Sequence, residues 1–355
     1  MREQLQNIKR VSSAKICMVV KADGYGFGDV LVCKKMYNLV DYFAVAKVSE
    51  LMHLRKCGIY KPVIILSPLI KSEILDAITF SGEISVDSLS RLKETAAAAE
   101  ELNKIAKIHV QIDTGMHRFG VDDAKEFVEI LEYIKGNEFL NLSGVYSHYY
   151  SADSSLIRKQ KFKFVSFKHI TKKMGFRPIF HISASGALPD ITSHFDMVRP
   201  GIYCYEKNAS LESEVIATKR LKKGEQLGYE HAYTASKDMF VATVGIGYGD
   251  GVRRTSKGFE VCDKNGNKYK VIGNVCMDCL FIDTGENKLN IGEKITVFGN
   301  NAASICDYAK HCGTISYEIL TGITKRVKRE IVCKSSQECL GVENLLVQSK
   351  AQDLP

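Results

Sequence analysis

The first two hundred residues alternate between short apolar runs rich in β-branched side chains and longer stretches that mix polar and apolar residues. Among the mixed stretches, 90–104 and 124–134 have the apolar spacing of an amphipathic helix. The short runs predict strands at 16–20, 43–48, 63–66, 84–86, 108–112, 142–146, 179–182 and 197–198. Eight strands separated by helices favour an α/β fold whose parallel βαβ units close into a (β/α)8 TIM-type barrel. An open, doubly wound sheet is the alternative.

The pattern changes after about residue 207, where glycine and asparagine turns become frequent and the runs between them alternate, as at 239–244 and 268–271. The segment 264–267 (KNGN) is typical of a tight hairpin turn. We therefore expect a barrel over 1–206, a second, mostly antiparallel β domain over 207–334, and a polar tail over 335–355. The tail is predicted to be either a docked helix or a frayed end.

Composition narrows the class of protein. Hydrophobic residues make up 45% of the 355 residues and charged residues 25%, as in soluble globular proteins. The amino terminus is too polar for a signal peptide, and the longest apolar runs are too short to span a membrane. The net charge of +8 is concentrated only at 158–173, spaced like a solvated helix face, and at 325–329, which looks like the end of an ordered element. We expect neither a nucleic-acid nor a membrane partner.

The chain has 11 cysteines, an odd number, many of them in apolar stretches. This pattern is typical of reduced, mostly buried thiols in a cytoplasmic protein. One C-x-x-C pair, Cys276 and Cys279, stands without a second pair or a histidine at zinc spacing. We interpret it as two thiols in a strand and expect no metal site.

Candidate chemistry follows the predicted strands, because the active site of a (β/α)8 barrel lies at the carboxyl ends of its strands. Lys21 closes the first apolar run, where partial burial would lower its pKa and favour imine formation. A lysine that extends out of the barrel mouth is the alternative. The other strand ends carry histidine, arginine, serine and glycine, which suit a phosphate. These residues are Arg118, His148, His181, Ser185, Arg199 and Gly201.

Six segments of the chain occur in the order seen in alanine racemases. They are 19–26 (VVKADGYG), 113–118 (DTGMHR), 198–202 (VRPGI), 247–251 (GYGDG), 276–278 (CMD) and 314–318 (TISYE). The first two are the more specific, and the resemblance extends from about residue 5 to residue 332. The chain thus resembles the alanine racemase family, fold-type III racemases that depend on pyridoxal 5′-phosphate.

The resemblance implies that Lys21 holds the cofactor as an imine and acts as one base. Tyr229, contributed by the other subunit of a head-to-tail homodimer, would be the opposite base. Cofactor contacts are implied for Lys21, Tyr25, His148, His181, Ser185, Arg199, Gly201, Ile202 and Tyr317. Substrate contacts are implied for Arg118, Met277 and Tyr248.

Inversion at an α-carbon needs an electron sink, which the cofactor supplies, and one base on each face. The phenol of Tyr229 must then lose its proton more easily than in water, and by resemblance His148 is expected to support it. An arginine at the cofactor's ring nitrogen, here Arg199, stays protonated and leaves that nitrogen neutral. The implied pathway is the supply of D-alanine for peptidoglycan.

The chain departs from the family in four places. Gln111 replaces a lysine that is often carbamylated, so we expect no carbamate and an amide that could still hydrogen-bond Arg118. Ala184 replaces an asparagine before the phosphate-binding serine. Asn274 replaces an arginine common at the entrance. The usual amino-terminal strand is also missing, since the chain begins almost at the first barrel helix.

Three other functions compete with alanine racemisation. A serine or broad-specificity racemase of the same fold is the closest, although the bulk of Tyr317 favours alanine. A barrel-type amino-acid decarboxylase would need other motifs in the second domain. A non-catalytic cofactor-binding barrel would lack that domain, which here carries Tyr229 and Tyr248.

Overall fold

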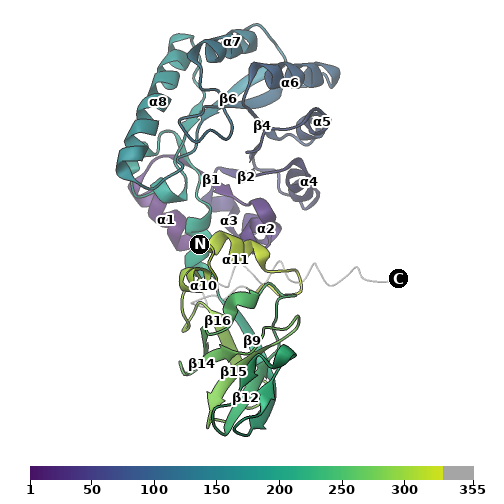
Figure 1. Ribbon diagram of the computed structural model, residues 1–355. Helices are drawn as coiled ribbons and strands as arrows, with labels where there is room; N and C mark the ends of the chain where they lie inside the picture. Colours follow the sequence, from purple (N-terminus) through teal and green to yellow (C-terminus); the bar gives the residue numbers. More distant parts are fainter. Residues whose placement is uncertain (331–355) are drawn as a thin grey trace, which may run out of the picture.

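The computed structural model describes residues 1–330, in which a parallel barrel is followed by a separate β domain (Figure 1). The barrel strands pair in parallel in the order β7-β6-β5-β4-β3-β2-β1-β8. Their bounds are β1 (Lys15–Val19), β2 (Tyr42–Val45), β3 (Val63–Ile65), β4 (Glu83–Val86), β5 (Ala106–Gln111), β6 (Leu140–Tyr146), β7 (Ile179–His181) and β8 (Met197–Val198). All eight predicted strands are present, with ends displaced by at most a few residues.

The two outer strands of this sheet, β7 and β8, approach each other and nearly close the barrel. The amide of Asp196 donates to the carbonyl of Phe180 at 2.9 Å, and that of Arg199 donates to Ser183 at 3.0 Å. A doubly wound sheet would reverse its strand order partway, whereas here the order runs without reversal around the ring. The TIM-type barrel prediction is confirmed, and the open sheet was wrong.

The helices cover the outside of the barrel and bury one stripe each. Ser88 caps α6 by accepting the Arg91 amide, and the buried positions Leu92, Ala96 and Ala99 repeat at helical spacing. The barrel helices are α1 (Arg2–Val11), α3 (Asp29–Met36), α4 (Val48–Lys56), α5 (Lys71–Thr79), α6 (Leu89–Glu101), α7 (Ala124–Lys135), α8 (Ser154–Lys173) and α9 (Ile202–Tyr205), with short 3-10 turns η1 (Tyr37–Leu39), η2 (Ser185–Ala187), η3 (Ile191–Ser193) and η4 (Glu206–Asn208). The basic stretch 158–173 lies in α8, as predicted.

The second domain is a closed antiparallel barrel with the strand order β12-β15-β14-β13-β16-β9. Its strands are β9 (Leu211–Leu221), β12 (Met239–Val244), β13 (Glu260–Asp263), β14 (Lys268–Ile272), β15 (Leu280–Gly285) and β16 (Lys294–Phe298), and the hairpin β10 (Gln226–Leu227) and β11 (Tyr233–Thr234) encloses η5 (Tyr229–His231). Further helical elements are η6 (Arg254–Ser256), α10 (Ile305–His311) and α11 (Ser316–Gly322). The mostly β second domain and the hairpin turn at 264–267 are confirmed.

The structure corrects the prediction for the C-x-x-C pair, and the predicted tail falls outside its range. Cys276 and Cys279 lie in the turn before β15 and not in a strand, because the Cys276 amide donates to the Cys279 carbonyl at 2.9 Å and closes the turn. The predicted tail over 335–355 lies outside the described residues.

None of the nine cysteines within 1–330 is in a disulfide. No helix within the same range is both long and apolar enough to cross a membrane.

The end of the second domain packs back onto the first strand's loop. Helix α11 lies against α2 (Lys21–Tyr25), as Figure 1 shows. A side chain at Gly26 would overlap the carbonyl oxygen of Leu320 in α11. Arg329 then donates from Nε to the carbonyl of Gly26 at 2.8 Å. The loop that carries Lys21 is therefore held by both domains.

Candidate active site

Lys21 stands at the carboxyl end of β1, at the start of a left-handed turn. The five residues from Ala22 to Gly26 all have positive φ, a strained conformation that persists only where neighbours enforce it. The carboxylate of Glu50 is one such neighbour, since it accepts the Ala22 amide at 2.7 Å and the Ala46 amide at 2.7 Å. The surrounding chain thus fixes the direction in which Lys21 leaves the strand.

Burial lowers the pKa of the Lys21 ammonium, the positive charge of Arg118 lowers it further, and Glu50 opposes both. A lowered pKa increases the fraction of neutral amine, which is the nucleophilic form. The half-buried amine is therefore suited to attack a carbonyl. Lys21 is therefore partly withdrawn from solvent at the barrel mouth and does not extend freely into it.

A small cradle forms where β7, β8 and the Lys21 turn end together. The hydroxyl of Ser185 accepts the amides of Gly201 at 2.9 Å and Tyr203 at 3.3 Å. A Cβ at Gly201 would lie 2.7 Å from the hydroxyl of Tyr25, so glycine allows that hydroxyl to approach the backbone closely. Ile202 begins α9 directly after Gly201.

Tyr317 reaches the same cradle from the second domain. Its ring centroid lies 6.1 Å from that of Tyr25, and Tyr25 in turn stacks on Tyr205 at 4.8 Å. Burial raises the pKa of Tyr25, with a smaller contribution from Tyr317, so its hydroxyl keeps its proton and can donate. The predicted residues Tyr25, Ser185, Gly201, Ile202 and Tyr317 are thus brought together.

Arg199 lies fully inside the barrel mouth. Its NH1 donates to Nδ1 of His181 at 2.6 Å, and its NH2 donates to the carbonyl of Ser147 at 2.6 Å and that of Ile182 at 3.3 Å. The guanidinium also lies over the ring of Tyr146, 5.4 Å from its centroid. These contacts fix the plane of a buried cation at the carboxyl end of β8.

The polar contacts continue below Arg199 through residues that strand-end motifs do not reveal. Nε2 of His181 lies 2.9 Å from Nδ1 of His109, whose Nε2 lies 2.7 Å from a carboxylate oxygen of Glu83. The sequence did carry a signal. Strands of a parallel barrel usually read as continuous apolar runs, whereas β4 and β5 carry Glu83, His109 and Gln111 at alternating buried positions.

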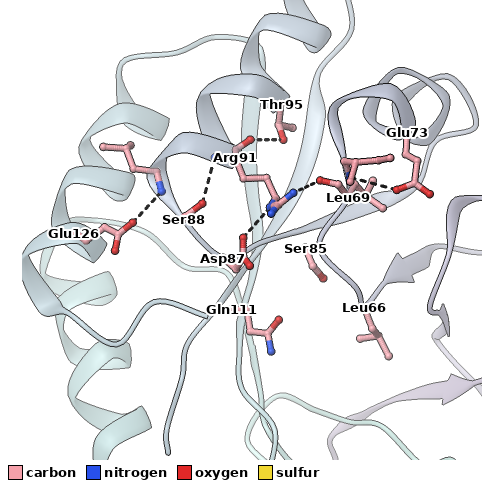
Figure 2. Close-up of polar contacts among 12 residues, drawn as sticks. Leu66, Leu69, Glu73, Ser85, Asp87, Ser88, Arg91, Thr95, Gln111 and Glu126 are labelled. Carbon is pink, nitrogen blue, oxygen red and sulfur yellow. Dashed lines mark hydrogen bonds and ion pairs between the residues drawn. The ribbon is translucent and has the colours of Figure 1, made fainter. Parts of the chain in front are cut away.

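Gln111 does not reach Arg118, contrary to the expectation that its amide could hold that arginine. Its Oε1 accepts the hydroxyl of Tyr146 at 2.8 Å, and the same hydroxyl lies 2.9 Å from Oγ of Ser85. Figure 2 shows Gln111 and Ser85 on their neighbouring strands. The amide oxygen of Gln111 is therefore hydrogen-bonded to the buried hydroxyl of Tyr146. Arg118 is exposed, 5.5 Å from the ring centroid of Phe119, and no hydrogen bond within 1–330 joins it to Gln111.

The rim of the mouth beside Gln111 is braced by Arg91. Its Nε donates to Asp87 at 2.8 Å, and its NH1 contacts the carbonyl of Leu69, so the segments that follow β3 and β4 are tied together (Figure 2). Glu126 accepts the Leu89 amide at 3.1 Å and adds α7 to this brace. The segments that follow β3 and β4 are therefore held in place by contacts from α6 and α7 on the outside of the barrel.

His148 lies among the cations of the mouth. Burial, then Arg199, Arg118 and Lys21, lower its pKa to about 3. The imidazole is therefore neutral near pH 7 in the single chain. It cannot support the phenol of Tyr229 there by positive charge, although a neutral ring nitrogen can still hydrogen-bond.

Tyr229, Tyr248 and Met277 are exposed residues on neighbouring loops of the second domain. Their exposed fractions are 71%, 42% and 52%. Asn274 donates to the carbonyl of Tyr229 at 3.3 Å, and the amide of Tyr248 donates to Cys276 at 3.0 Å, which links their loops. Among the described residues, no hydrogen bond, ion pair or ring contact joins this group to Lys21. One chain thus brings the predicted cofactor contacts together but leaves the predicted second base apart.

Comparisons with known proteins identify the family of the chain. The family description "Alanine racemase, N-terminal domain" matches residues 1–209, and "Alanine racemase, C-terminal domain" matches residues 208–331. The alanine racemase of Treponema denticola is 34% identical, over 93% of this chain and 96% of its own. That of Methanococcus maripaludis is 32% identical over 92% and 95%. The solved alanine racemase of Clostridium difficile 630 superposes with a TM-score of 0.88 at 31% identity and covers 94% of each chain. The chain belongs to the alanine racemase family.

Proposed function

We propose that this chain interconverts L- and D-alanine with pyridoxal 5′-phosphate held as an imine on Lys21. The observation that carries the proposal is a half-buried lysine of lowered pKa at the carboxyl end of β1, beside a cradle built from Ser185 and Gly201. The names of the relatives support alanine as the substrate.

The residues of the mouth fit this cofactor. The hydroxyls of Tyr25 and Ser185 both lie close to the backbone at Gly201 and together suit a phosphate group. Arg199 offers a fixed cation for the ring nitrogen, with His181 behind it. When bound, the cofactor supplies the electron sink that makes the α-proton of an amino acid removable. We assign His148 and Tyr317 to the lining of the same site.

Two bases are needed for inversion, and we assign them to Lys21 and Tyr229. Lys21 moves the proton on one face of the substrate, and the phenol of Tyr229 moves it on the other. Because Tyr229 is 71% exposed on the second domain, we infer that it enters the mouth of another subunit in a head-to-tail homodimer. Tyr248 and Met277 would accompany it and shape the entrance.

Arg118 is our candidate for binding the substrate carboxylate. Its positive charge lowers the pKa of both Lys21 and His148, so it lies near both residues. We propose a cytoplasmic enzyme that supplies D-alanine for peptidoglycan. The nine cysteines within 1–330, all of them free thiols, support a reducing compartment. A serine or broad-specificity racemase of the same fold is distinguished by comparing kcat/KM for alanine and serine.

The experiment is exchange of the α-proton in heavy water, starting separately from L- and D-alanine. Both enantiomers should exchange and interconvert with the purified enzyme. Lys21→Ala should abolish exchange from both. Tyr229→Phe should keep the cofactor bound but block exchange from one enantiomer only. Normal racemisation by Tyr229→Phe would refute the two-base assignment, and no exchange in the wild-type enzyme would refute the function.

A further inference from the structure

The buried contacts between Arg199 and Glu83 form one continuous line through the barrel. They join Arg199 to His181 at 2.6 Å, His181 to His109 at 2.9 Å, and His109 to Glu83 at 2.7 Å. Arg199 follows β8 at the carboxyl end of the barrel, whereas Glu83 is the first residue of β4. The line therefore crosses the barrel from the mouth toward its opposite end.

The direction of every hydrogen bond in this line is fixed by its first member. A guanidinium can only donate, so Nδ1 of His181 must accept, and the ring proton of His181 must be on Nε2. That N–H donates to Nδ1 of His109, which must therefore carry its own proton on Nε2. Glu83 must then accept from His109. Each imidazole is held as a neutral ring with a single tautomer.

All four residues of this line are buried, so their charges and polar atoms need hydrogen-bond partners. His109 and His181 are 0% exposed, Glu83 is 3% exposed and Arg199 is 3% exposed. A buried charge is costly unless it is paired and hydrogen-bonded. The two ends of the line carry opposite charges, and the neutral imidazoles between them satisfy the polar atoms of both. Burial, Arg199 and His109 together hold the pKa of His181 well below its usual value.

Space for the line is provided by Gly144 in β6. A Cβ at this position would overlap Nδ1 of His109, the atom that accepts from His181. The pairing of β5 with β6 also shifts register between Ile108 and His109. The glycine at 144 and the shifted register thus leave room for the imidazole of His109 between β5 and β6.

We propose that Glu83 and His109 are positioning residues. With His181 they form a one-way hydrogen-bond chain that fixes the His181 tautomer and so holds Arg199 in place at the barrel mouth. The identity of the group that Arg199 faces, the cofactor ring nitrogen, rests on the proposed function. The chain itself does not, because it follows from contacts within the protein.

The first test is nitrogen-15 NMR of the histidine rings in the holoenzyme. In the wild type, His109 and His181 should both give the signals of neutral rings protonated at Nε2. Glu83→Leu removes the terminal acceptor and should change the tautomer or protonation of His109. Glu83→Gln keeps an acceptor oxygen without the charge and should preserve the wild-type pattern in part.

The second test is kinetic. Losing a hydrogen bond to a charged group typically costs about 1.5–3 kcal/mol, so Glu83→Leu should lower kcat about ten- to a hundredfold with a smaller change in KM. Glu83→Gln should restore part of that loss. Lys107→Met is the matched control. It removes the exposed cation 4.0 Å from the other oxygen of Glu83 and should leave both readouts unchanged.

The outcomes separate the two claims. Wild-type ring signals or wild-type kcat in Glu83→Leu would overturn the positioning role. If Glu83→Leu fails to fold, Glu83→Gln decides the matter. Altered ring signals with a partly lowered kcat would support the positioning role, whereas wild-type ring signals with a wild-type kcat would overturn it. A wild-type enzyme that exchanges no α-proton refutes the proposed function, while its ring signals still decide whether the chain exists.

Discussion

At the scale of single residues, the position of Lys21 accounts for the lowered pKa of its ammonium group. The same amine on the surface would be protonated near neutral pH, whereas burial and the charge of Arg118 lower its pKa. A lowered pKa means that the neutral fraction at any pH below the normal value is larger than for an exposed lysine.

Labelling of lysines in the cofactor-free enzyme should reveal this shift. The reaction of Lys21 with an amine-reactive reagent, followed by peptide mass spectrometry across pH, should reach half-maximum at lower pH than that of Lys328. Lys328 is the control because its hydrogen bond with Glu330 raises its pKa. Arg118→Leu should move the Lys21 midpoint upward. A midpoint for Lys21 at or above that of Lys328 would contradict the structure.

The cradle at Gly201 gives a second prediction at this scale. Gly201→Ala places a methyl group 2.7 Å from the hydroxyl of Tyr25 and should weaken cofactor binding about tenfold or more, measured by equilibrium titration of the cofactor-free enzyme. Gly186→Ala is the matched control. Its Cβ would meet only the Cβ of Ala152 at 3.7 Å, so its affinity should stay near wild type. Equal affinities for the two variants would argue against a phosphate at Gly201.

At the scale of elements, the left-handed turn after β1 depends on contacts from outside it. Glu50 from α4 holds its start, and α11 with Arg329 holds its end. Such a turn is stable only while its neighbours are in place.

Two glycine substitutions separate backbone conformation from close packing. Gly26 and Gly224 have φ near +81° and +88°, so alanine is strained at both by about 1–2 kcal/mol. Nothing lies within 4 Å of a Cβ at Gly224, whereas at Gly26 it would overlap the Leu320 carbonyl. Gly26→Ala should therefore lower the free energy of unfolding clearly more than Gly224→Ala in denaturant titrations. Similar losses would show that α11 yields easily.

The elements also show how far the sequence could predict this molecule. Hydrophobic runs located all eight barrel strands, since a strand buried on both faces must be apolar over several residues. Glu83 and His109 were not predicted as site residues because neither lies at the carboxyl end of its strand. Only the folded structure shows that they line up with His181. The left-handed turn after β1 was not predicted for a related reason. Ala22 and Tyr25 do not favour positive φ, and contacts from α4 and α11 hold the turn that imposes it.

At the scale of the whole molecule, the exposure of Tyr229 predicts an active site shared between subunits. Lys21→Ala and Tyr229→Phe should each be nearly inactive as pure homodimers. Mixing them in equal amounts under conditions that exchange subunits should restore about a quarter of the wild-type rate, because half the dimers are mixed and each contains one intact site. Racemase assays before and after mixing measure this. Absence of recovery, with subunit exchange verified by differential labelling, would place both bases in one chain.

The hydrogen bond from Arg329 to Gly26 spans 303 positions of the sequence. During synthesis the Lys21 turn leaves the ribosome early, but the residue that locks it is added only after the rest of both domains. At about 5–20 residues per second, that interval is roughly 15 to 60 seconds. Throughout this time the nascent chain carries the Lys21 turn without the hydrogen bond from Arg329. A chain that stalls before Arg329 therefore has the Lys21 turn without the side chain that holds its end.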